Sequence, residues 1–305
     1  MTEVQGNIFD VLSWDAYIGQ EKIKERLQIK IHAAMARFEQ MDHALILGQS
    51  GTGKSTIARL IAKEHNVGFL DLMITPAFTT KTLEKKLLEF NEEGGGIVLL
   101  DEIHNFSNRD QHFLYSVLQD NCISRNNGEK VYFNNPLTII AATTDEKDLT
   151  AALRGRFGAP YRLRDYTDKE MGQIIERMAY KAGMEPTIET CIALGKASAG
   201  SPRQAADLIK TARDLGSMDP GPILKLSEIT KDGLTVDHVA VLDSLRNLGN
   251  RAGLENLSNH SGRAKEDIVN LEKLLVKKGL VEMGGKGREL TMKGLKVLKE
   301  IQESK

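Results

Sequence analysis

The chain has 305 residues, of which 41% are hydrophobic, and its formal net charge is −1. That length is enough for two or three domains with buried cores, and the nearly neutral balance does not by itself indicate a nucleic-acid partner. No apolar stretch approaches the roughly 20 residues of a membrane span, the N-terminal residues lack the order of a secretion signal, and Cys122 and Cys191 stand isolated. We therefore expect a cytoplasmic protein without membrane contact and without a structural metal.

Five short apolar runs alternate with helical patterns over the first half of the chain. Such alternation is typical of an α/β domain with a parallel sheet and helices on both faces. We place this domain at residues 1–166. The predicted strands are Ala44–Leu47, Phe69–Met73, Ile97–Leu100, Leu137–Ala142 and Tyr161–Leu163.

A phosphate loop follows the first of these runs. Residues 48–55 match the pattern G-x-x-x-x-G-K-[ST], and a helical pattern begins directly after them. Glycines in this motif let successive backbone N–H groups face one anion, and the helix N-terminus adds partial positive charge. We expect Lys54 to reach the β- and γ-phosphates of ATP and the Ser55 hydroxyl to ligate Mg²⁺. The motif predicts nucleotide contacts from Gly48, Gly51, Thr52, Gly53, Lys54, Ser55 and Thr56.

An acidic pair, Asp101 and Glu102, ends the third apolar run. On its own such a pair is usually part of a solvated loop. Beside a complete phosphate loop, however, it predicts that Asp101 holds Mg²⁺ and that Glu102 polarises the water that attacks the γ-phosphate.

The second half of the chain has a different pattern. A capping-box signature at residues 167–170 opens a run of helical patterns, which predicts an all-helical domain over residues 167–233. Residues 234–305 read as three helices followed by a hairpin with a glycine-rich tip at 284–287, which predicts a winged helix. From Ser261 onward there are 11 Lys and Arg against 7 Asp and Glu, a net charge of +4, which is a weak indication of DNA binding.

Further motifs mark a family. Ala141 to Thr144 end the fourth predicted strand, and Leu153-Arg154-Gly155-Arg156-Phe157-Gly158 and Gly200-Ser201-Pro202-Arg203 follow. The order and spelling of these motifs resemble the AAA+ ATPases and, within them, the RuvB family of Holliday-junction branch-migration motors. The resemblance implies an AAA+ domain, a helical lid and a winged helix, and an ATPase that works with Mg²⁺ as a homohexameric ring on double-stranded junction DNA.

The resemblance also implies roles for individual residues. Tyr17 and Ile18 would form an adenine pocket, and Tyr166 is assigned to the same nucleotide site. Thr144 would stand beside the attacking water as a first sensor. Arg203 of the lid would reach the γ-phosphate bound by its own subunit.

Two arginines and the winged helix carry the implied contacts with neighbours. Arg156 would be an arginine finger inserted into the adjacent subunit's site, with Arg154 nearby. Lys286 and Arg288 of the wing would contact the DNA backbone.

The chain departs from the RuvB pattern at the hairpin that would dock a RuvA-like adaptor. Residues 121–136 fill this segment, and its expected tip, residues 125–130, is short and polar, whereas the family has an aliphatic tip. Two functions stay open as a result. One is a DNA motor that migrates Holliday junctions, and the other is an AAA+ loader or remodeller that acts mainly on a protein partner at DNA.

Overall fold

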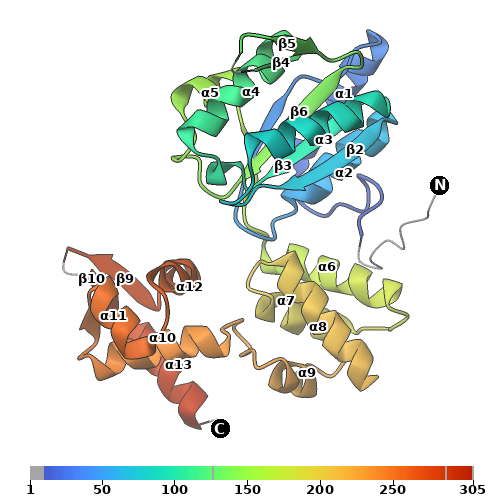
Figure 1. Cartoon of the computed structure of the whole chain (residues 1–305). Helices are drawn as coiled ribbons and strands as arrows, with labels where there is room; N and C mark the ends of the chain where they lie inside the picture. Colours follow the sequence, from blue (N-terminus) through green and yellow to red (C-terminus); the bar gives the residue numbers. More distant parts are fainter. Residues whose placement is uncertain (1–9, 126, 286, 304–305) are drawn as a thin grey trace. The chain divides into compact units, whose positions relative to one another are not determined.

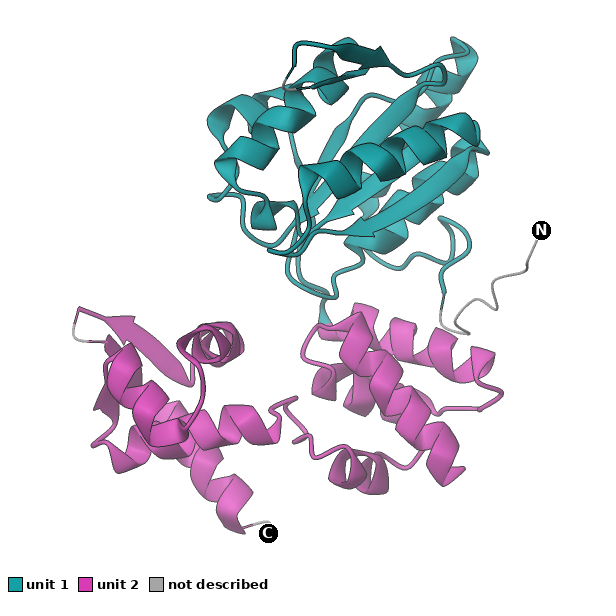
Figure 2. Cartoon of the chain, viewed as in Figure 1, with its two compact units in different colours: residues 1–167 teal, residues 168–305 magenta. Residues whose placement is uncertain are grey.

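The computed structural model describes residues 10–125, 127–285 and 287–303 (Figure 1). The chain forms two compact units, residues 1–167 and 168–305 (Figure 2). The finer division into three domains at 166/167 and 233/234 stays a prediction. Among the described residues, no helix is long and apolar enough to cross a lipid bilayer.

The first unit is built on a five-stranded parallel sheet with the strand order β2-β3-β6-β1-β7. This confirms the predicted α/β class. The five predicted strands are present with ends shifted by no more than one residue. The elements of this unit are α1 (Glu21–Ala36), β1 (Ala44–Leu47), α2 (Lys54–His65), β2 (Gly68–Met73), α3 (Thr80–Glu92), β3 (Gly96–Asp101), the 3-10 turn η1 (Ile103–Asn105), α4 (Asn108–Asp120), β4 (Cys122–Ser124), β5 (Lys130–Tyr132), β6 (Leu137–Thr143), α5 (Ala151–Arg156) and β7 (Tyr161–Arg162).

Helices cover both faces of this sheet, so that its central strands are buried on both sides. Along β1, Leu45 and Leu47 pack with α3, α4 and α5, whereas Ile46 between them packs with α1 and α2. Strand β3 alternates in the same way. The continuous apolar runs in the sequence follow from this two-sided burial.

The parallel register brings three strand ends to one edge of the sheet. Leu47 at the end of β1 pairs with Thr143 of β6, and Asp101 at the end of β3 pairs with Ala142. The loop after β1, the acidic pair at the end of β3 and the Thr-Thr sequence at the end of β6 therefore meet. This edge is the usual place for a ligand in an open α/β sheet.

The second unit holds two groups of helices. Helices α6 (Asp168–Lys181), α7 (Ile188–Ala197), α8 (Pro202–Leu215) and α9 (Pro220–Leu226) come first. The winged helix follows, with α10 (Val236–Asn247), β8 (Arg251–Ala252), α11 (Leu254–Ser261), α12 (Lys265–Lys277), β9 (Val281–Gly284), β10 (Gly287–Leu290) and α13 (Met292–Glu303). The sequence patterns did not identify β8, which pairs with β10, or α13.

Candidate active site

The phosphate loop joins β1 to α2 and needs glycine at defined positions. Gly51 and Gly53 have positive φ angles of 78° and 96°. A Cβ on Gly53 would lie 2.6 Å from the Tyr17 hydroxyl, and one on Gly48 would lie 2.8 Å from Thr52 Oγ1. Glycine is thus required both for the turn and for close packing. Because α2 begins at Lys54, the N–H groups of its first turn provide an anion site at this loop.

Lys54 and Ser55 lie at the start of α2. The Lys54 side chain is only 5% exposed, and its Nζ donates to the carbonyl oxygens of Gly48 at 3.0 Å and Gln49 at 3.3 Å. Ser55 Oγ donates to Asp101 Oδ2 at 2.8 Å. Hydroxyl and carboxylate oxygens are the ligands that Mg²⁺ prefers, so these two residues fit a magnesium ion.

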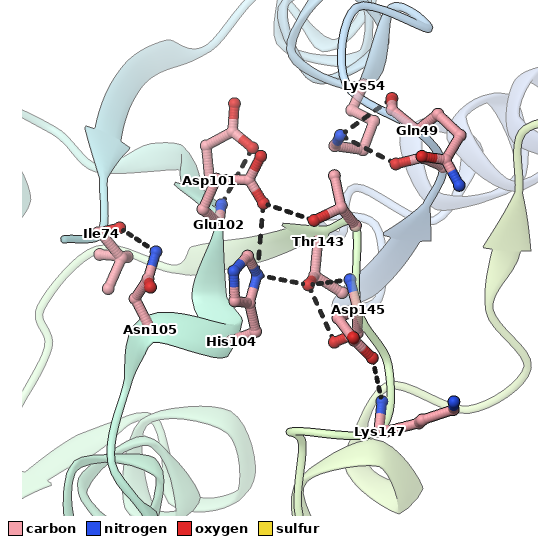
Figure 3. A network of polar contacts seen from close by, with 12 residues as sticks. Gln49, Lys54, Ile74, Asp101, Glu102, His104, Asn105, Thr143, Asp145 and Lys147 are labelled. Atoms are coloured by element: carbon pink, nitrogen blue, oxygen red, sulfur yellow. Dashed lines mark hydrogen bonds and ion pairs between the residues drawn. The ribbon is translucent and has the colours of Figure 1, made fainter. Parts of the chain in front are cut away.

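The catalytic candidate Glu102 follows Asp101 in an uncommon backbone conformation. Its φ angle of 55° lies in the left-handed region, which costs a non-glycine residue on the order of 1–3 kcal/mol. Its backbone N–H donates to Asp101 Oδ1 at 3.0 Å. Its carboxylate oxygen Oε2 lies 3.4 Å from the Thr144 hydroxyl. The same oxygen lies 3.3 Å from His104 Nδ1 (Figure 3).

The two threonines at the end of β6, Thr143 in the strand and Thr144 directly after it, have different surroundings. The buried Thr143 hydroxyl contacts His104 and the backbone of Asp145, whereas the Thr144 hydroxyl donates to Glu102. The structure thus brings Thr144 to Glu102. Sequence reasoning missed His104, and the only signal for it was its position two residues after Glu102.

Two tyrosine side chains contact the phosphate loop. The hydroxyls of Tyr17 and Tyr166 lie 3.3 Å and 3.1 Å from the Thr52 carbonyl oxygen and 3.2 Å from each other. Burial, and then the neighbouring Tyr166, raise the pKa of Tyr17, so it stays a neutral phenol. Ile18 beside it is half-buried. Both predicted tyrosines therefore lie at the phosphate loop.

The two candidate arginines of α5 have partners within the first unit. Arg156 lies over the Tyr115 ring, with its guanidinium carbon 4.0 Å from the ring centre, and donates to Ala152 O at 2.8 Å and Gln119 Oε1 at 3.1 Å. These contacts hold Arg156 on α4 and α5. Arg154 lies 3.8 Å from Glu146.

Arg203 belongs to the second unit, where it is exposed in the first turn of α8. Ser201 caps this helix by accepting from the Gln204 N–H, and Pro202 takes the first helical position.

Comparison with known proteins places these motifs in a family. The model "Holliday junction DNA helicase RuvB P-loop domain" matches residues 11–163, and the model "RuvB C-terminal winged helix domain" matches residues 231–299. The chain belongs to the RuvB family. It is 33% identical to the RuvB subunit of Campylobacter fetus, over 94% of this chain and 88% of that protein, and 32% identical to that of Fervidobacterium nodosum, over 92% and 86%. The solved RuvB motor of Thermotoga maritima superposes with a TM-score of 0.83 at 28% identity, covering 96% of this chain and 99% of that one.

Membership in the RuvB family makes this chain a P-loop ATPase with a winged helix. The matched P-loop domain contains the loop, the acidic pair, Thr144 and the arginines of α5.

The predicted hairpin is present as β4–β5, and two of its charged residues pair with neighbouring helices. Cys122 pairs with Tyr132 at its base. Arg125 forms ion pairs with Glu84 of α3 at 2.8 Å and with Glu129 at 3.0 Å, and Lys130 pairs with Asp120 at 3.2 Å. The charges of this RuvB-type hairpin are largely neutralised within the chain.

The wing differs from the expectation for a DNA contact. Lys286 lies outside the described residues. Arg288 makes a two-pronged ion pair with Glu272 of α12, at 2.7 Å and 2.9 Å, and the two side chains are only 13% and 10% exposed. On the same strand Glu289 faces Glu282 and accepts from Arg251. A DNA contact by Arg288 would require its ion pair to open.

Proposed function

We propose that this chain is an ATP-driven motor that moves Holliday junctions and works as a hexameric ring on double-stranded DNA. The observation that carries the proposal is the arrangement at the carboxyl edge of the sheet. Glu102 lies between Thr144 and His104, next to the Ser55–Asp101 pair and the phosphate loop. The RuvB relatives named above are subunits of Holliday-junction branch-migration complexes.

The residues divide the hydrolysis step between them. The N–H groups of the loop and Lys54 would hold the β- and γ-phosphates. Ser55 and Asp101 would hold Mg²⁺, which would supply charge that neutralises the phosphates. Thr144 and Glu102 orient a water molecule, and Glu102 takes its proton as the water oxygen attacks the γ-phosphorus. The bond to the bridging oxygen breaks, leaving ADP and phosphate.

Two arginines would link this step to neighbouring parts of a ring. The partners of Arg156 on α4 and α5 support a role outside its own phosphate loop, where it would neutralise transition-state charge in the adjacent subunit. Arg203 would bind the γ-phosphate within its own subunit. Losing that contact on hydrolysis favours a different lid orientation, which would move the DNA held by the winged helix.

The hairpin supports the second candidate, a loader or remodeller of a protein partner. Its polar, ion-paired tip cannot supply the desolvated aliphatic contacts that dominate protein interfaces. A RuvA-like adaptor that binds residues 121–136 would need polar chemistry of its own. The motor function rests on the ATP site and the winged helix, and the nature of the adaptor stays open.

Strand exchange on a synthetic four-way junction tests the motor function. The purified chain, with and without a candidate RuvA-type adaptor, is expected to convert the junction to duplex products only when ATP is hydrolysed. Glu102→Gln is the matched control, because it preserves the shape of the side chain and loses its basicity. ATP turnover that the junction stimulates but that never moves the branch point would favour the remodeller.

A further inference from the structure

His104 lies directly beside the proposed general base. It projects from η1, the turn that follows β3, and is half-buried. Its Nδ1 is 3.3 Å from Glu102 Oε2 and 2.8 Å from Thr143 Oγ1 (Figure 3). One ring nitrogen thus faces both the carboxylate and a buried hydroxyl.

The hydrogen bonds of Thr143 determine which atom carries the proton. The Thr143 hydroxyl donates to Asp145 O at 3.1 Å and accepts from the Asp145 N–H at 3.0 Å. Toward His104 it therefore presents a lone pair. Since the Glu102 carboxylate is also an acceptor, both neighbours of Nδ1 require it to be the protonated nitrogen.

We infer that His104 is a positioning residue for Glu102. Its Nδ1, fixed by the hydrogen bond with Thr143, lies against Oε2 of the carboxylate and leaves Oε1 to take the proton from the attacking water. This inference rests on the proposed role of Glu102 as the base.

The surroundings of Glu102 explain why such a group is needed. The left-handed backbone does not fix the carboxylate, whose side chain is 24% exposed, and the Thr144 hydroxyl alone is a distant partner at 3.4 Å. The contacts of His104 and Thr144 with one oxygen fix the plane of the carboxylate. With Oε2 in these contacts, Oε1 is the oxygen left to accept the proton of the attacking water.

A matched set of variants tests this inference. The amide nitrogen of Asn occupies nearly the position of Nδ1, whereas that of Gln occupies the position of Nε2. His104→Ala and His104→Gln are expected to lower kcat about 10-fold to 100-fold, because misplacing a reacting group costs up to about that factor. KM for ATP and the affinity for a fluorescent ADP analogue should not change. His104→Asn should recover most of the rate.

Measuring the effect of His104→Ala in a protein that already carries Glu102→Gln distinguishes a positioning role of His104 from a structural one. If His104 acts through Glu102, adding His104→Ala to Glu102→Gln should cause no further loss of the residual rate. A wild-type kcat in His104→Ala, an equal loss in both backgrounds, or an Asn variant as slow as the Gln variant would each overturn the inference. If His104→Ala does not fold, comparing kcat of His104→Asn with kcat of His104→Gln still tests the inference.

The same experiment keeps this inference apart from the proposed function. Near wild-type turnover by Glu102→Gln alone would remove Glu102 as the base, and the function assigned to the site would fail with it. An inactive Glu102→Gln together with a fully active His104→Ala would leave the proposed function intact and remove only His104.

Discussion

The phosphate-loop edge of the first unit and the wing of the second unit hold their charged side chains in different ways. Lys54 donates to two backbone carbonyls, and Asp101 accepts from a hydroxyl. Arg288, by contrast, is bound at both prongs to the carboxylate of Glu272. A ligand can replace neutral partners at little cost, whereas it must separate opposite charges to reach an ion-paired side chain. The partners of a charged side chain thus help to distinguish residues that bind a ligand from residues that stabilise the fold.

The largest effect is expected at the phosphate loop. Lys54→Ala should lose measurable ATP binding and turnover, because no other side chain of the loop can place a positive charge at the β- and γ-phosphates. Binding of a fluorescent nucleotide and steady-state hydrolysis measure this. Retained affinity would mean that the loop N–H groups alone hold the nucleotide.

Arg156 tests whether a neighbour completes the site. Arg156→Ala should reduce kcat about 10³-fold or more, since an arginine finger neutralises transition-state charge. Mixing it with Lys54→Ala should restore some turnover at interfaces that combine an intact loop with an intact arginine. Mass spectrometry can verify that the two inactive variants mix in one assembly. If they mix and no turnover is restored, Arg156 acts only within its own subunit.

Tyr115 should have a smaller effect on the same step. Its ring lies under Arg156, its hydroxyl contacts Thr150 Oγ1 at 3.0 Å, and Thr150 caps α5. Tyr115→Leu should lower kcat about tenfold by removing a cation–π contact of roughly 1 kcal/mol and freeing the guanidinium. Tyr115→Phe keeps the ring and should stay close to wild type. A Leu variant with unchanged kcat would mean that Arg156 leaves Tyr115 before it acts.

At the wing, the comparison predicts loss of stability rather than loss of binding. Arg288→Ala leaves the buried Glu272 carboxylate without its counter-charge and should destabilise the winged helix by about 2–4 kcal/mol. Thermal unfolding of the full chain measures this. The apolar pair Glu272→Leu with Arg288→Met should recover most of the stability.

The apolar pair also tests the predicted DNA contact of Arg288. If the pair folds and DNA affinity and its salt dependence do not change, Arg288 supports the fold only. A salt slope flatter by about one unit would show that Arg288 reaches a phosphate after all.

The sequence was sufficient wherever the structure depends on local pattern. Strand β1 has the predicted ends, and the phosphate loop and acidic pair fall where their motifs indicate, because burial on both faces and glycine turns leave direct traces in the sequence. His104 and Arg288 could not be assigned in this way. Thr143, the partner of His104, lies on β6, and Glu272, the partner of Arg288, lies on α12. Only folding brings these partners together, so local sequence patterns do not reveal the pairs.

His238 should make the second unit sensitive to acid, although this effect is the smallest. Burial, the largest cause, and nearby Lys278 lower the pKa of His238 from 6.5 to about 4, although Asp237 opposes the shift. The ring is held neutral because its Nδ1 accepts from the Thr235 N–H at 3.2 Å at the start of α10. The unfolded chain therefore binds a proton first as the pH falls below about 6.5. Stability should drop by on the order of 2–3 kcal/mol between pH 6.5 and pH 4 and level off below that.

Hydrogen exchange of the α10 amides at pH 7 and pH 5, corrected for the intrinsic rates, measures this loss. His238→Asn is the matched control, because its Oδ1 can accept from the Thr235 N–H but does not titrate in this range. The wild type should lose protection of α10 at pH 5, and the Asn variant should not. Equal losses in both proteins would show that carboxylates elsewhere in the unit cause the acid sensitivity. The loss should also be absent from the phosphate-loop edge, since His238 and the α10 amides that it caps belong to the second unit alone.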